Sequence, residues 1–283
     1  MPSLLSRIDY AITLFQAAEY EEAKILFGRL FKLYKRENHI ENMKLCLYHL
    51  ACIAYIQGER QNFYELSSLY QACILNKEDV LQDIEYYMLR GLEGLSFHHY
   101  GEAIHAFSYA IALAEKRRLT EHKILSLLYI QKCHLLLGHT ELTLKISNEL
   151  WTTYQEEIQS DTVQFFYYHL NRADTLYALA HLEEMSELLK ACETHKDLQA
   201  VPQVYAKTLV TRAKFHMAKK KNRLALSALK KAVEIAESRE DPILQSEVYE
   251  LLIENYERRG KPKKALHYAK KRLALHTKMM KAL

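Results

Sequence analysis

The sequence contains few residues that interrupt a helix. Only 7 glycines and 4 prolines occur among 283 residues, far fewer than in an ordinary globular chain. This scarcity excludes a loop-rich fold and predicts long helices joined by short turns. Three of the prolines stand where helices are expected to begin, because proline fits the first helical turn: Pro202, Pro242 and Pro262.

Long apolar runs are also missing. No stretch of about 18 uncharged apolar residues occurs, so no membrane span is expected. The first 24 residues carry acidic and polar side chains where a signal peptide needs an apolar run, so a cytoplasmic location is expected. The 5 cysteines are scattered and odd in number and form no C-x-x-C pair, which favours buried thiols in a reducing compartment.

Sequence signatures of catalysis are absent as well. The chain has no glycine-rich phosphate loop, no G-x-S-x-G, no H-E-x-x-H and no Cys/His metal spacing. The nearest thing to a ligand pair is His98-His99, which is expected on a surface turn. We therefore expect no enzyme activity, no metal and no cofactor.

The chain repeats itself about every forty residues. Small or apolar residues follow a helix-turn-helix bend at seven positions: Ala23, Phe63, Ala103, Thr143, Met185, Ala225 and Ala265. The bends themselves keep the same period: Ala18, Gly58, His98, Gly138, Ala180, Lys220 and Gly260. A fixed period of this length is typical of a stacked helical array in which no unit buries its apolar face alone.

The predicted fold is therefore all-α, one domain over 1–283 with about seven helix-turn-helix repeats and fourteen helices. The repeats are expected at 3–39, 40–78, 79–119, 120–160, 161–199, 200–240 and 241–281. Two of the predicted helices are 79–97 and 140–157. In the second repeat the register could slip by three residues, which would put Leu66, Tyr70 and Cys73 in place of Phe63, Ser67 and Tyr70.

The pattern inside the units resembles tetratricopeptide repeats. The second helix of the third unit carries a small, a large aromatic and a small residue at Ala103, Phe107 and Ala110. A small residue lets two helices approach closely, and the large one fills the gap between units. The family's usual period is shorter, so the longer units here are similar to the arrays of the Rap, PlcR and NprR kinds of bacterial peptide-receptor regulators. They are also similar to sensory arrays fused to signalling enzymes.

The resemblance implies a right-handed superhelical solenoid whose first helices line a concave groove that binds a peptide or protein. In the first three units the implied groove positions are mostly apolar: Ile8, Ile12, Phe15, Tyr48, Cys52, Tyr55, Met88, Leu92 and Leu95. The later units mix aromatic and polar groups. Ten residues are the expected ligand or partner site: Lys132, Tyr167, Asn171, Asp174, Tyr177, Lys207, Lys214, Glu247, Glu250 and Glu254.

Two features of that list stay open. Lys132, Asn171 and Lys207 fall near positions that the family's two-carboxylate clamp uses to hold peptide C-termini. The glutamates of the last unit, which include Glu257, lie on one helical face. They form either a solvated stripe or an acidic wall that faces Lys207 and Lys214.

Charge divides the chain into two parts. Residues 200–283 contain 20 Lys+Arg and 8 Asp+Glu, a net charge of +12, whereas the rest carries −8. The basic part is read as a solvated cap, a surface for an acidic partner protein, a contact for head-to-tail self-association, or a nucleic-acid surface. Few aromatic residues lie among these lysines, which argues against nucleic acid.

The function expected from the sequence is a scaffold or sensor for a peptide or protein in bacterial-type signalling. The alternatives are a sensory or dimerisation module of a larger cyclase or transcription regulator, or binding of nucleic acid or an acidic partner through the basic part. No membrane partner is expected, and a homodimer stays open.

Overall fold

A computed structural model describes residues 4–17, 19–57, 59–74, 82–196, 198, 202–239 and 241–281. Within these ranges the chain forms fourteen α-helices and no strand. The helices are α1 (Leu4–Gln16), α2 (Tyr20–Glu37), α3 (Ile40–Ile56), α4 (Arg60–Ala72), α6 (Ile84–Ser96), α7 (Tyr100–Arg117), α8 (Thr120–Leu136), α9 (Thr140–Ser160), α10 (Thr162–Ala178), α11 (Leu182–Thr194), α12 (Pro202–Ala218), α13 (Asn222–Ser238), α14 (Pro242–Arg258) and α15 (Pro262–Lys281). The all-α repeat fold expected from the sequence is confirmed.

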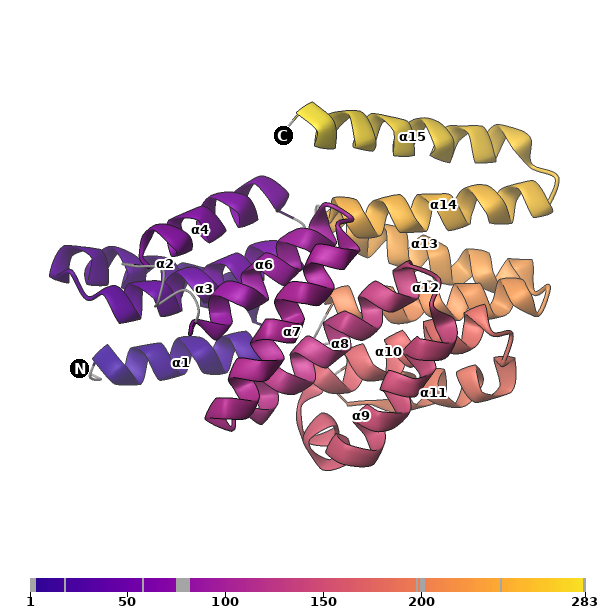
Figure 1. Cartoon of the computed structure of the whole chain (residues 1–283). Helices are drawn as coiled ribbons and strands as arrows, with labels where there is room; N and C mark the ends of the chain where they lie inside the picture. The colour runs from indigo at the N-terminus through magenta and orange to yellow at the C-terminus, as the bar shows by residue number, and fades with distance from the viewer. Residues whose placement is uncertain are drawn as a thin grey trace. The chain divides into compact units, whose positions relative to one another are not determined.

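From α1 to α9, and again from α11 to α15, each helix packs against the next along the chain, as α6, α7 and α8 do in Figure 1. The chain divides into two compact units, Met1–Phe165 and Phe166–Leu283. Inside each unit, first helices of successive pairs also touch: α3 contacts α6 in the first unit, and α12 contacts α14 in the second.

A recurrent turn ends the first helix of five of the pairs. His98, Gly138, Ala180, Lys220 and Gly260 all have φ between 57° and 78°, the left-handed conformation that closes helices. The N–H of the residue after each one donates to the carbonyl five residues earlier, at 2.8–2.9 Å. This pair of features defines a Schellman turn, so five of the seven predicted bends share one conformation. The other two, Ala18 and Gly58, lie outside the described residues.

The seven positions that define the repeat are all buried. Ala23, Ala103, Thr143, Met185 and Ala225 are 0% exposed, and Phe63 and Ala265 are at most 4% exposed. These side chains face the partner helix of their own pair, where only small or well-fitted groups have room.

The second repeat keeps its primary register. Phe63, Ser67 and Tyr70 are buried, whereas Leu66 and Cys73, which the three-residue slip would place inside, are only partly covered.

Close approach between α6 and α7 explains two glycines. A Cβ at Gly91 would lie 2.4 Å from the ring of Phe107, and a Cβ at Gly94 would lie 3.0 Å from the backbone of Ala103. Phe107 is fully buried and stacks on the ring of Tyr129. The helices therefore touch nearly backbone to backbone, as the small residue in the repeat predicts.

Two predicted helix boundaries are wrong. The helix expected from residue 79 begins at Ile84, because the Asp83 side chain accepts a hydrogen bond from the Tyr86 N–H and caps the helix one residue earlier. Residues 79–81 lie outside the described ranges. The helix expected to end at 157 runs to Ser160 and has a kink at Tyr154 (φ −131°, ψ 29°).

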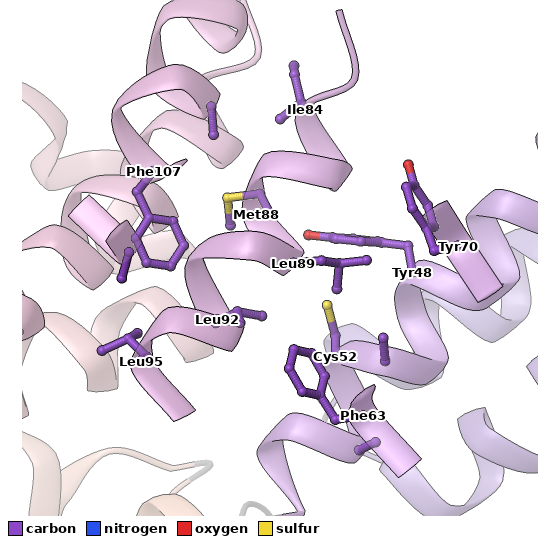
Figure 2. Close-up of a cluster of buried hydrophobic side chains, with 14 of the residues drawn as sticks. Tyr48, Cys52, Phe63, Tyr70, Ile84, Met88, Leu89, Leu92, Leu95 and Phe107 are labelled. Atoms are coloured by element: carbon purple, nitrogen blue, oxygen red, sulfur yellow. The ribbon is translucent and has the colours of Figure 1, made fainter. Parts of the chain in front are cut away.

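The apolar positions that the resemblance assigns to a groove are largely covered in the first unit. Met88 and Leu92 are 2% exposed, and Tyr48, Cys52 and Leu95 at most 9%. Figure 2 shows them in one cluster with Phe63 and Phe107, formed by α3, α4, α6 and α7. These side chains hold successive pairs together and are core residues.

Among the described residues, no helix is both long enough and apolar enough to span a bilayer. The five cysteines form no disulfide, and four of them are buried. No group of three or more metal-ligating side chains occurs in the part of the chain that the structure covers.

Candidate functional site

The second unit carries polar side chains at several of the positions that the resemblance assigns to a groove. These residues lie on α10, α12 and α14, the first helices of three successive pairs. Tyr167 and Asp174 are seven residues apart on α10, and Lys207 and Lys214 are seven apart on α12. Seven residues are about two helical turns, or roughly 10 Å, so each pair points to one side of its helix. We call this surface, with Glu247 of α14, the polar face.

One end of the polar face is a three-residue ion cluster. The Lys214 ammonium lies 3.2 Å from Oδ1 of Asp174 and 2.8 Å from Oε1 of Glu247. The side chains of Lys214 and Asp174 are 17% and 16% exposed, whereas that of Glu247 is 42% exposed. Burial alone lowers the pKa of Lys214, but the two carboxylates more than offset it, so the pKa is raised. The two carboxylates therefore keep the lysine of the cluster charged.

The other end is a cation–π pair. The Lys207 ammonium lies 5.5 Å from the centre of the Tyr167 ring, and the Lys207 side chain is exposed. Its positive charge also acts on Asp241, the buried N-cap of α14. Burial raises the pKa of Asp241, while backbone N–H donors and Lys207 oppose that rise. The Lys207 ammonium is therefore a solvent-exposed cation over the ring of Tyr167.

The amide of Asn171 lies between these two ends. Leu170 and Val210, which fall midway on α10 and α12, are 6% and 2% exposed and so belong to the core, as Met88 does at the same repeat position. Asn171 is half-buried beside them, and its backbone carbonyl accepts a hydrogen bond from the Thr175 hydroxyl at 2.8 Å. Its side-chain amide is able to donate and accept at once. An extended chain laid between the two ends would meet this amide and, at one end, the half-buried ring of Tyr167.

The acidic side chains of α14 do not act as one wall. Glu247 contacts Lys214, but Glu250 pairs with Arg272 of α15 at 2.9 Å. Glu254 pairs with Arg258 of its own helix at 2.5 Å. The glutamate stripe is therefore divided among three partners, and only its first member joins the polar face.

The remaining two candidates are not among the residues that define the polar face. Tyr177 is half-buried on the last turn of α10. Lys132 is half-buried on α8 in the first unit, whereas the other nine candidates lie in the second.

Several ion pairs of the second unit have no sequence signal of their own. Lys219, on the basic bend after α12, pairs with Glu183 of α11 at 2.5 Å. Glu237 accepts hydrogen bonds from both the Tyr249 hydroxyl and Lys271. The forty-residue period does relate Asp174 to Lys214, since both occupy the same place in successive repeats, and this is the one signal that points to a contact.

The described geometry defines a helical-repeat protein of the tetratricopeptide-like class. No protein-family model matches the chain, and no curated protein matches its sequence. A search of solved structures finds a crystal structure of a Rap protein complexed with competence and sporulation factor. It matches with a TM-score of 0.71 and 16% identity, over 97% of this chain and 76% of that one. The chain is therefore similar in fold to a Rap protein, as the repeat pattern predicted.

Proposed function

We propose that this protein is a non-enzymatic scaffold or sensor that binds a peptide, or an extended segment of a protein, along the polar face. A contrast at one repeat position carries the proposal. In the first unit Cys52 and Leu92 occupy this position, 8% and 2% exposed, and Lys132 occupies it in the fourth repeat. In the second unit the same position holds Asp174 and Lys214, which form the ion cluster, with an exposed lysine and a half-buried amide nearby on the same helices.

The cost of the ion cluster supports a binding role. Placing Lys214 against two carboxylates costs desolvation that apolar residues in place of all three would avoid. A surface that combines charges, an amide and the aromatic ring of Tyr167 offers a bound peptide both contact with its side chains and hydrogen bonds to its backbone.

The charges suggest how the ligand would lie. Lys207 would pair with a carboxylate, either the C-terminus or an acidic side chain. The Asp174 and Glu247 carboxylates, about 10 Å away along the helices, would accept hydrogen bonds from an amino terminus or a basic side chain. A segment of three to four extended residues spans that distance. The Rap structure that matches this fold was determined with a bound factor, which is consistent with the proposal.

Selection from a random peptide library, followed by calorimetry on the best binders, tests the proposal. Asn171→Ala should weaken binding by about 1–3 kcal/mol, because a desolvated backbone group loses its partner. Lys207→Ala should weaken it by roughly 0.2–1 kcal/mol, with the effect lost at high salt, since this lysine is exposed.

Lys230→Ala is the matched control, because Lys230 is an exposed lysine on α13 of the same unit. It should bind like the unmodified protein. Selected peptides that bind equally well to all three variants would show that recognition lies elsewhere.

A further inference from the structure

The last helix, α15, stands where α13 stands one repeat earlier. α14 covers one side of α13 and runs antiparallel to it. The Asn255 amide of α14 donates to the backbone carbonyl of Asn222 at the start of α13, at 3.1 Å. The Tyr249 hydroxyl donates to Glu237 at the other end, at 2.7 Å. Among the residues that the structure describes, none covers the same side of α15.

Residues at matching repeat positions are more exposed on α15 than on α13. Val233 of α13 is 8% exposed, whereas Leu273, forty residues later, is 70% exposed. Leu226 is partly buried against the core, whereas its match Leu266 is 56% exposed. A shallow hollow on this side of α15 is mainly apolar. We define the outer face of α15 by Leu266 and the residues of the hollow: Lys270, Leu273, Ala274, Thr277 and Lys278.

Charge indicates what would cover these leucines. Seven Lys or Arg residues and no acidic residue lie between Pro262 and Lys281. Lys271 and Arg272 pair inward with Glu237 and Glu250. Lys270 and Lys278 line the hollow and form no ion pair with any residue in the described ranges. A second copy docked through this face would bring like charges together, which is unfavourable.

We propose that the outer face of α15 binds an amphipathic helix of an acidic partner protein, antiparallel to α15. Leu266 and Leu273 would be covered by the apolar stripe of that helix. Lys270 and Lys278 would pair with carboxylates that flank the stripe. The contact would continue the packing that α14 makes on α13. This surface is separate from the polar face and does not depend on peptide binding there.

The probe is a synthetic peptide of residues 241–259 with blocked ends and a fluorescent label. This segment forms α14, covers the matching side of α13, and carries four glutamates at 247, 250, 254 and 257. Anisotropy titrations with the full chain should show binding that Leu273→Glu weakens at least about tenfold, the change expected for about 1.4 kcal/mol. A peptide with the four glutamates changed to glutamine should bind several-fold more weakly and lose most of its salt dependence.

Leu224→Glu is the control, because Leu224 is 52% exposed on α13, outside the outer face of α15. It should bind the peptide within about twofold of the unmodified chain, and neither change should lower the melting temperature, since both sites are exposed. Absence of binding, or binding that Leu273→Glu leaves unchanged, overturns the proposal. So does sedimentation in which the unmodified chain is a dimer and Leu273→Glu a monomer, because a second copy would then occupy the face.

Discussion

Gly91 and Gly28 provide a direct test of how closely α6 and α7 approach. Both are helical glycines of the first unit, on α6 and α2. A Cβ at Gly91 would lie 2.4–2.7 Å from three ring carbons of Phe107, whereas a Cβ at Gly28 would meet nothing within 4 Å. Carbon atoms pack best about 3.5–4.0 Å apart, so alanine at position 91 forces the ring to move. The ring is fully buried and stacked on Tyr129, with centroids 5.0 Å apart.

The magnitude follows from two opposing effects. Replacing a glycine in a helix interior by alanine stabilises the fold by roughly 0.5–1 kcal/mol. Overpacking a close-packed core by one methyl group costs about 1–3 kcal/mol. Gly28→Ala should therefore raise the free energy of unfolding by roughly 0.5–1 kcal/mol. Gly91→Ala has the same helical gain, so the packing cost alone should make it about 1–3 kcal/mol less stable than Gly28→Ala.

Urea unfolding followed by circular dichroism measures this difference. Both glycines lie in one unit, so both variants report on the same transition, and the comparison is valid where the slope m is unchanged. If Gly91→Ala proves as stable as Gly28→Ala, the helices do not approach at Gly91 as described.

Four further outcomes are expected. Ala103→Trp should destabilise the first unit by at least about 1–3 kcal/mol in urea, and Gly101→Trp should cost less, because a side chain there meets no neighbour. Burial, with a smaller contribution from His122, lowers the pKa of His49 to about 4 from 6.5. The stability from neutral His49 is present above pH 6.5 and is lost as the pH falls toward 4. Between these pH values the free energy of unfolding of His49→Phe should therefore fall by roughly 2–4 kcal/mol less than that of the unmodified protein. Lys214→Met should destabilise the second unit by about 1–3 kcal/mol. Because the pKa of Lys214 is raised above 10.5, this difference should hold at neutral pH and narrow only above pH 10.5. Finally, nucleic acids should show no tight binding at about 150 mM salt in filter assays, and only weak, salt-sensitive binding below that.

The fold was predictable because its main signal is repeated. Ala103 and Ala225 mark the same helix crossing in different units, and each is 0% exposed. The helix start at Ile84 was not predictable from the period, since one side chain, Asp83, decides it by capping the helix. The kink at Tyr154 likewise has no signal in the repeat.

The candidate site was predictable in its residue types more than in its contacts. Asp174 and Lys214 share a repeat position forty residues apart, so their contact follows from the period. The contact of Lys214 with Glu247 crosses between two different repeat positions, and only the three-dimensional stacking of α12 and α14 decides it. Glu250 carries the same charge on the same helix, yet it pairs with Arg272, because α15 lies within its reach.

Native mass spectrometry of the protein purified from its own cells tests the central claim most directly. A peptide held on the polar face should appear as a defined extra mass on the unmodified chain. That mass should be missing from the double variant Asn171→Ala, Lys207→Ala and present on Lys230→Ala. A peptide that stays on the double variant at the same occupancy would contradict the account, because the polar face would then not be what holds it.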